Sequence, residues 1–233
     1  ERFPDRCCDF VNEIAAPLPL RIICEMMGIP HQDEKQVFAW TNTILGAGDP
    51  EYGGTFEKLM QDSMAMFAYA NTLGENRLAN PQDDLTSALM HAEVDGERLS
   101  PAEFGSFFIL LVVAGNETTR NAISHGMRLL TQHPEQKELW FGDFDRHSRN
   151  AVEEIVRIAS PVIHFRRTVL TDTEIRGVPI PAGSKVVLFY NSANRDEDVF
   201  EDPYRFDITR DPNPHVGFGA AGPHFCLGAH LAR

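Results

Sequence analysis

The first half of the chain has the hydrophobic spacing of α-helices. Apolar side chains recur three and four residues apart over residues 1–30, from Asp33 to a loop at 46–50, and from Thr55 to Leu78. This spacing places them on one face of a helix. A mainly helical N-terminal half is therefore expected.

Local signals refine these helices. Pro17 and Pro19 are expected to break the first one, and Asp33 with Gln36 is a candidate capping box for the second. The third helix has an apolar stripe that predicts mainly core packing. Its members are Met60, Met64, Phe67 and Ala68.

Residues 101–132 have the longest helical pattern in the chain. Ser100 suits the N-cap of this helix, Pro101 its first position and Glu103 its third. A helix of about 32 residues would extend roughly 48 Å at 1.5 Å per residue. Residues 104–114 are apolar on nearly every face. They predict a central helix buried in the protein and are too few to span a bilayer.

The pattern changes to strands after Ser160-Pro161. Two helices are expected before this point, at residues 135–140 and 147–159. Three β-like segments follow it, at residues 162–170, 173–178 and 184–190, with a turn at 179–183 between the last two. Residues 191–214 are polar and Pro-rich and predict an irregular meander. The predicted fold class is mainly α with small β-sheets.

Composition narrows the function. The net charge of −13 argues against a nucleic-acid binder, which would need a basic face. The sequence contains no run of 18 apolar residues, so no membrane span is expected in it. The four cysteines are Cys7, Cys8, Cys24 and Cys226, and they lack the spacing of paired metal ligands. This usage favours a reducing, cytoplasmic compartment. The chain begins at Glu1 and ends inside a helical pattern at Arg233, so we expect part of a longer protein.

The long helix becomes polar over residues 114–121. Gly115 and Thr118 disfavour a helix interior, so this segment is a candidate functional site. The Thr118 hydroxyl could bond the Ala114 carbonyl and open a groove for dioxygen and water. A polar kink that only satisfies buried groups is the alternative.

A second candidate site lies at residues 218–228. Cys226 stands between Gly222 and Gly228, with helix-forming residues after it. A helix N-terminus favours a thiolate, glycines let the backbone approach a flat macrocycle, and His224 can donate to a propionate. The interpretation is a thiolate ligand to haem iron, and the alternative is an ordinary buried cysteine.

This loop resembles the haem-binding loop of the cytochrome P-450 family, the haem-thiolate monooxygenases. The match lies at Gly222, His224, Cys226 and Gly228. Phe218 is one residue further from the cysteine than the usual pattern, as in a subset of bacterial members. The resemblance covers nearly all of the chain and about half of a typical member.

Further motifs carry the same resemblance. Glu117 and Thr118 match the acid–alcohol pair of the family, which relays protons during oxygen activation. Glu154 and Arg157 match its Glu-x-x-Arg ion pair, and Arg205 fits the second arginine of that structural lock. The resemblance also implies that Arg166, on β-like residues, pairs with a haem propionate.

The resemblance implies one partial domain over residues 1–233. Residues 1–146 would be mostly helical and include a substrate lid and the central helix 101–132. Residues 147–233 would contain the Glu-x-x-Arg helix, short strands, meander and haem loop. The implied cofactor is haem b, iron protoporphyrin IX. Its expected contacts are Cys226 as metal ligand, with Arg166, His224, Phe218, Gly222, Gly228, Ala114 and Gly115 around it.

The implied activity inserts one atom of O2 into an apolar substrate, with electrons from a ferredoxin and ferredoxin reductase type of partner. Similarity to bacterial members that act on steroids or methyl-branched lipids suggests such substrates. Candidate lining residues are Phe107, Phe108, Leu111, Val112 and Ala114. The alternatives are a peroxide-dependent or rearranging haem-thiolate enzyme, a non-catalytic haem or hydrophobic-ligand carrier, and an inactive fragment. These 233 residues alone are expected to bind haem poorly.

Overall fold

The computed structural model describes residues 7–47, 49, 54–220 and 222–233. The chain divides within its longest helix into two compact units, Glu1–Arg120 and Asn121–Arg233. Each unit is described by itself below. The expectation of a single domain stays a prediction.

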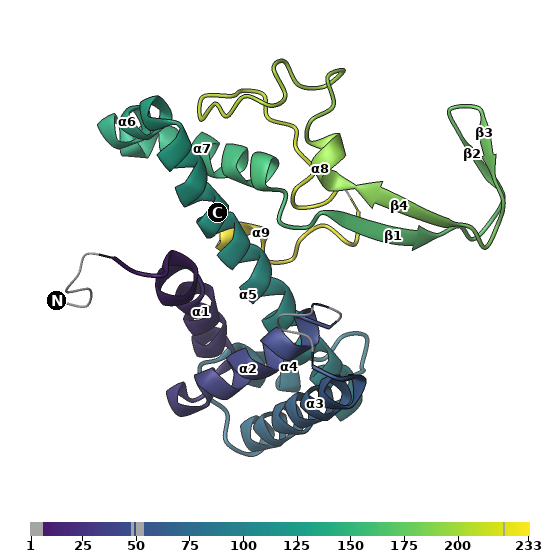
Figure 1. Ribbon diagram of the computed structural model, residues 1–233. Helices are drawn as coiled ribbons and strands as arrows, with labels where there is room; N and C mark the ends of the chain where they lie inside the picture. Colours follow the sequence, from purple (N-terminus) through teal and green to yellow (C-terminus); the bar gives the residue numbers. More distant parts are fainter. Residues whose placement is uncertain (1–6, 48, 50–53, 221) are drawn as a thin grey trace. The chain divides into compact units, whose positions relative to one another are not determined.

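The first unit is helical (Figure 1). It contains a π-helical turn at Val11–Ala15, α1 at Pro17–Met27, a 3-10 turn at His31–Asp33, α2 at Glu34–Leu45, α3 at Phe56–Ala79, α4 at Leu85–His91 and the first part of α5 at Pro101–Gln132. The predicted bounds of α5 are confirmed.

The second unit combines helices with two small antiparallel sheets, so the predicted fold class is confirmed. It contains the rest of α5, α6 at Pro134–Gly142, α7 at Phe144–Ala159, β1 at His164–Thr168, β2 at Thr173–Ile175, β3 at Val178–Ile180, β4 at Lys185–Phe189, α8 at Tyr190–Ala193 and α9 at Ala229–Ala232.

Two predicted helix signals act differently in the structure. Pro17 begins α1 rather than breaking a helix, because the first turn needs no backbone N–H donors. Asp33 does not cap α2 with its side chain, because its carboxylate accepts a 2.9 Å hydrogen bond from the Tyr69 hydroxyl. The Ser100–Glu103 capping box of α5 is present, with Ser100 N–H donating to Glu103 over 2.9 Å.

The core of the first unit forms between α1, α2, α3, α4 and one face of α5. Phe104, Phe108 and Val112 of α5 are fully buried there. The predicted apolar stripe of α3 is wrong, because Met60 and Met64 are 45% and 67% exposed. The buried face of α3 instead includes charged residues that have ion-pair partners, and this hides it in the sequence pattern. Its members are Asp62, Met66, Ala70, Leu73, Gly74 and Arg77.

The opposite face of α5 is open within the described residues, which corrects the prediction of burial on nearly every face. Ser106, Leu110 and Ala114 are exposed and lie four residues apart, so they share this face. The apolar composition of residues 104–114 concealed this asymmetry. Consequently α5 offers one packed face and one accessible face.

The second unit has its core between α5, α7 and the meander. The buried members are Leu129, Leu130, Ala151, Ile155, Phe206 and Ile208. A Cβ at Gly126 would lie 3.1 Å from Ile155 Cδ1. The glycine therefore lets α5 and α7 approach each other closely at this point.

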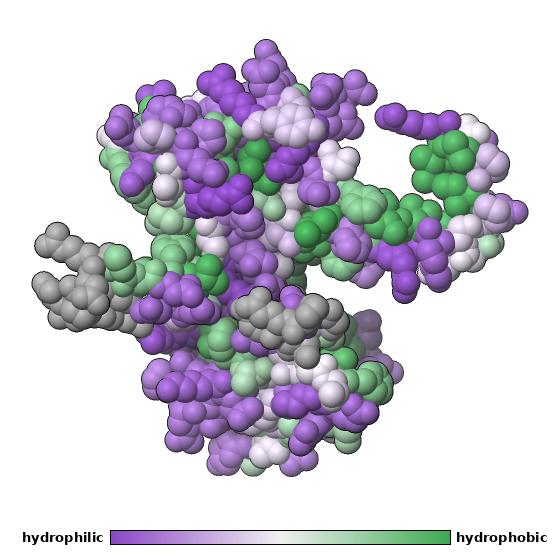
Figure 2. All heavy atoms as spheres, in the orientation of Figure 1, coloured by the Kyte–Doolittle hydropathy of each residue, from purple (hydrophilic) through white to green (hydrophobic). Residues whose placement is uncertain are grey.

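The sheets are two hairpins in which β1 pairs with β4 and β2 pairs with β3. Arg176 and Gly177 both have positive φ, as the two-residue turn between β2 and β3 requires. The predicted turn at 179–183 is present in its second half, where Ser184 N–H donates to the Pro181 carbonyl over 3.2 Å, while β3 occupies residues 179–180. Figure 2 shows apolar side chains gathered along these hairpins. Exposed members are Phe165, Leu170, Ile175, Val178, Leu188 and Phe189.

Candidate functional site

The loop that carries Cys226 is anchored to α7 at its upstream end. Val216 N–H donates to the Asn194 side-chain oxygen over 2.8 Å, and Asn194 is fully buried. At Gly217 an added Cβ would lie 2.5 Å from Val156 Cγ1, so the chain passes directly against the helix there. The absence of a side chain at Gly217 makes this contact possible.

Phe218 connects this anchor to the cysteine. The Cys226 N–H donates a 2.8 Å hydrogen bond to the Phe218 carbonyl. The Phe218 ring lies 5.9 Å from the His215 ring and 4.2 Å from the Arg233 guanidinium carbon. Phe218 and Cys226 are therefore brought together by the backbone, although they are eight positions apart.

The thiol of Cys226 is free and partly exposed. Cys24, by contrast, lies in the helical core, where burial together with Glu34 and Glu25 raises the pKa of its thiol to about 12. Such a thiol stays neutral and does not ligate metal in this state. Of these two thiols, Cys226 is the one that suits a ligand role.

The surroundings of Cys226 fit a flat group held by one protein ligand. Added Cβ atoms at Gly222 and Gly228 would meet nothing within 4 Å among the described residues. Those residues also hold no group of three or more His, Cys, Asp or Glu side chains that could bind a metal ion together. A single thiolate is the donor set expected for a haem.

The two predicted propionate partners both lie in the second unit. Arg166 is exposed on β1 opposite Val187 of β4, and His224 is exposed in the loop two residues before Cys226. Arg167 points to the other face of the strand by alternation. Their assignment to a propionate stays a prediction.

Residues 114–120 of the polar segment of α5 belong to the first unit. Thr118 Oγ1 donates a 2.7 Å hydrogen bond to the Ala114 carbonyl, as predicted, while the helix remains α-helical through this segment. Glu117 forms an ion pair with Arg120, one turn along the helix. The carboxylate expected as the acid of the pair thus also has a structural partner.

The glycine of this segment has a packing role. A Cβ at Gly115 would lie 2.5 Å from Ile23 Cδ1, so this residue lets α1 approach α5. Two of the expected pocket residues, Phe108 and Val112, are fully buried in the helical core and do not line an accessible surface. Ala114 remains on the open face.

Sequence reasoning missed Asn116. Asn116 is 1% exposed, and neither its amide nitrogen nor its amide oxygen has a hydrogen-bond partner among the described residues. Asn116 lies one turn beyond Val112 on the packed face of α5, and its position in a helical period of 3.6 was the available signal.

The Glu-x-x-Arg pair is present and fully buried. Arg157 donates to both carboxylate oxygens of Glu154, over 2.7 and 2.8 Å. The remaining donors of Arg157 bond the backbone carbonyls of three residues in the following chain: Asn194, Pro203 and Arg205. The pair fixes the meander to α7 through backbone contacts.

The predicted role of Arg205 needs correction. Its side chain is 62% exposed and lies 3.7 Å from Asp207, while its carbonyl is what Arg157 binds. The second arginine at the Glu154 carboxylate is Arg210, at 3.3 Å. The two arginines are five positions apart in the irregular meander, which has no periodicity that would distinguish them.

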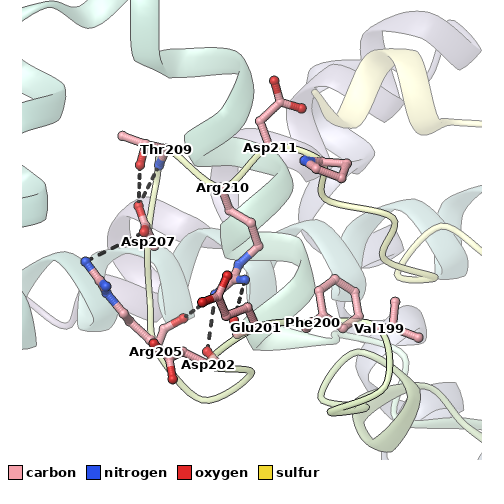
Figure 3. A pocket seen from close by; sticks show the side chains of 10 residues that line it. Val199, Phe200, Glu201, Asp202, Arg205, Asp207, Thr209, Arg210 and Asp211 are labelled. Atoms are coloured by element: carbon pink, nitrogen blue, oxygen red, sulfur yellow. Dashed lines mark hydrogen bonds and ion pairs between the residues drawn. The ribbon is translucent and has the colours of Figure 1, made fainter.

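A polar pocket of about 430 Å³ lies beside this lock (Figure 3). Arg210 crosses it and donates to the Glu201 carbonyl over 2.7 Å, while Arg205 and Asp207 face one another at its edge. A larger pocket of about 600 Å³ is lined by residues such as His125, Arg128 and Tyr204. The charge on the first pocket does not suit an apolar substrate.

A cluster around Glu153 was not predicted. His215 Nε2 lies 2.6 Å from Glu153 Oε2, and Arg233 pairs with the same carboxylate. Burial raises the pKa of Glu153, but hydrogen bonds from Arg233 and His215 outweigh it and hold that pKa below its usual value. Burial lowers the pKa of His215, against the opposing effect of Glu153. Glu153 precedes Glu154 and resembles an ordinary surface residue in the sequence.

Comparison with known proteins gives consistent results. The family model for cytochrome P450 matches residues 148–233. A methyl-branched lipid omega-hydroxylase of Mycobacterium tuberculosis is 60% identical over 230 residues, which are 99% of this chain and 54% of that protein. A steroid C26-monooxygenase of Rhodococcus jostii is 50% identical over 225 residues, 97% of this chain and 46% of that protein.

Solved structures of cytochrome P450 proteins are also similar to this chain. A Mycobacterium marinum cytochrome P450 in complex with pseudoionone has a TM-score of 0.88 and 48% identity, covering 97% of this chain and 55% of that one. A cytochrome P450 of the Bacillus subtilis bacillaene polyketide synthase has a TM-score of 0.90 and 39% identity, covering 97% and 57%. The chain spans about half the length of the relatives it matches.

Proposed function

Because the chain belongs to the cytochrome P450 family, we propose that it carries the haem-binding and proton-delivering part of a haem-thiolate monooxygenase. The whole protein would insert one atom of O2 into an apolar organic substrate. The observation that carries this proposal is the free thiol of Cys226, whose backbone is tied through Phe218 to a loop anchored on α7.

The cofactor of the proposal is haem b. Cys226 would be the iron ligand, and Arg166 and His224 would bind the propionates through charge-assisted hydrogen bonds. The open space over Gly222 and Gly228 supports a flat group at this loop. When bound, haem supplies O2 activation, which a thiolate ligand favours by donating electron density.

Proton delivery is assigned to the polar segment of α5. The Thr118 hydroxyl donates to the Ala114 carbonyl and keeps its lone pairs available to accept a further hydrogen bond. Glu117, the adjacent carboxylate, would exchange protons with it, and its ion pair with Arg120 fixes the direction of its side chain. Thr118 lies one turn beyond the exposed Ala114, which supports access from the open face.

The names of the relatives support a lipid substrate, either a steroid or a methyl-branched lipid. Phe107, Leu111 and Ala114 remain the candidate lining residues, since they lie outside the fully buried core of the first unit. A titration of haem-loaded protein with sterols and branched fatty acids, followed by the spin-state change in the absorption spectrum, distinguishes the two classes. No spectral shift with either class would remove the lipid assignment.

Electrons would come from a ferredoxin and its reductase. The net charge of −13 means that any docking face for an acidic ferredoxin is a local basic patch. Arg233, which lies close to the Cys226 loop, pairs with Glu153, so its charge is partly neutralised. The free cysteines among the described residues support a reducing cytoplasm as the compartment. None of the described helices is sufficiently long and apolar to cross a membrane.

The decisive experiment is the spectrum of the reduced carbonyl complex of the whole haem-loaded protein. Thiolate ligation predicts a strongly red-shifted Soret band in the parent protein and its loss in Cys226→Ser. Cys8→Ser, which removes an exposed thiol, is the matched control and should retain the band. A carrier with another ligand would show haem absorption without the shift, and this result would contradict the proposal.

A further inference from the structure

One carboxylate on α7 binds both flanks of the Cys226 loop. Glu153 accepts a 2.6 Å hydrogen bond from His215, eleven residues before the cysteine, and pairs with Arg233, seven residues after it. The side chains of His215 and Glu153 are 3% and 19% exposed. The contact is therefore a largely buried, charge-assisted bridge rather than a surface ion pair.

The backbone fixes the orientation of the histidine. Gly217 N–H donates to His215 Nδ1 over 3.1 Å, so Nδ1 is the acceptor and the ring hydrogen lies on Nε2. Nε2–H therefore donates to Glu153, as the 2.6 Å separation requires. A single neutral tautomer satisfies both contacts.

Phe218 connects the His215–Glu153–Arg233 bridge to Cys226. The Phe218 ring contacts both the His215 ring, at 5.9 Å between centroids, and the Arg233 guanidinium, so both partners of Glu153 pack against this side chain. The carbonyl of Phe218 in turn accepts the Cys226 N–H at 2.8 Å. A displacement of His215 or Arg233 would thus reach the backbone of Cys226 through one residue.

We propose that Glu153, His215 and Arg233 form a loop clasp that sets the position of the Cys226 thiolate. Glu153 is a positioning residue, because it acts on the sulfur through Phe218 rather than touching it. The role is distinct from that of the adjacent Glu154, which holds Arg157, Arg210 and the meander. The inference rests on the proposed function in taking Cys226 as the ligand.

The test uses Glu153→Gln in the whole protein, which keeps the shape of the side chain and removes its charge. Asp145→Asn, the same change at an exposed position of α7, is the matched control. The first measurement is amide hydrogen exchange of residues 216–226 without haem. Loss of charge-assisted hydrogen bonds should speed exchange at Cys226 by about tenfold or more.

The second measurement is the reduced carbonyl spectrum after loading with haem. Glu153→Gln should lower the fraction of protein with the red-shifted Soret band, whereas Asp145→Asn should match the parent. Arg233→Gln should act in the same direction, and the double variant should be no worse than Glu153→Gln, because both changes release one bridge. Arg233, one-third exposed, supplies the test where Glu153→Gln does not fold.

The outcomes separate the two proposals. If the parent never shows the red-shifted band, the proposed function fails, and exchange at Cys226 still decides whether the clasp exists. If the parent shows the band and Glu153→Gln changes neither the band nor the exchange rate, the clasp is overturned and the monooxygenase proposal stands.

Discussion

Arg157 and Glu154 face one another through two parallel hydrogen bonds, with neither side chain exposed to solvent. A buried charge without its partner is costly, because the protein interior does not replace the lost solvation. Glu154→Gln should therefore lower the free energy of unfolding by about 3–5 kcal/mol, as measured by urea denaturation.

Arg205→Gln provides the control for that prediction. The Arg205 side chain is 62% exposed and its carbonyl makes the contact with Arg157, so the substitution should change stability by less than about 0.5 kcal/mol. A large loss in this variant, or a small one in Glu154→Gln, would contradict the described lock.

The contacts of Glu154 and Arg157 could be predicted from the sequence only in part. Glu154 and Arg157 are three apart on a helix, and helical geometry predicts their contact. The partners of Arg157 in the meander are backbone carbonyls, which every residue offers, so no side-chain pattern identifies them. For the same reason, the sequence pattern does not distinguish Arg205, whose carbonyl binds Arg157, from Arg210, whose side chain binds Glu154.

The sequence likewise predicts some features of the long helix α5 and not others. The bounds of α5 follow from Ser100 and Glu103 at its start and from apolar spacing along its length. Which face packs depends on α1 and α3, and the apolar residues on both faces gave no means of telling them apart. The exposure of the face that carries Leu110 and Ala114 is therefore decided by tertiary packing and not by the local sequence.

Gly217 does not adopt a positive φ, yet the close contact with α7 leaves no room for a side chain. A Cβ at this position would lie 2.5 Å from Val156 Cγ1 and 3.1 Å from His215 Nδ1. Gly217→Ala should cost about 1–3 kcal/mol of stability through overpacking, measured by thermal or urea unfolding. Gly142→Ala, where nothing lies within 4 Å, should be nearly neutral; equal losses would argue against the close contact.

The buried histidine predicts a pH effect. Burial lowers the pKa of His215 in the folded state below its ordinary value of 6.5, although Glu153 and Glu154 oppose this and Arg233 supports it. As the pH falls through 6.5, the unfolded state binds the proton first, so folding stability should decrease.

Urea midpoints over a pH series, for the parent and His215→Gln, measure this effect. The variant lacks the titrating group, so its stability should decline less over the window just below pH 6.5. The depressed pKa of Glu153 acts in the same direction at lower pH, below its ordinary 4.5. Parallel curves for the two proteins would show that His215 is not the group responsible.

Thr118 and Thr131 of α5 form the same local contact, in which the hydroxyl donates to the carbonyl four residues back over 2.7 and 2.8 Å. Under the proposed function, only Thr118→Ala should uncouple the reaction, with more peroxide released per electron consumed. Thr131→Ala controls for the loss of a hydroxyl from the helix. Coupling that stays unchanged in Thr118→Ala would remove the assigned relay.

Asn116 places an amide in the packed face of α5, and within the part of the chain that the structure describes neither of its polar atoms has a hydrogen-bond partner. Burying an unsatisfied amide costs roughly 1–3 kcal/mol, and Leu has the same branched arrangement of heavy atoms with two methyl groups in place of the amide oxygen and nitrogen. Asn116→Leu should therefore raise the free energy of unfolding, by about 1 kcal/mol or more, whereas the exposed Asn191→Leu should leave it nearly unchanged. A destabilising Asn116→Leu would contradict this prediction and would show that the amide has a partner in the folded protein, such as a bound water. In that case Asn116, which lies between Gly115 and Glu117, would contribute hydrogen bonds to the polar segment instead of lowering the stability of the helical core.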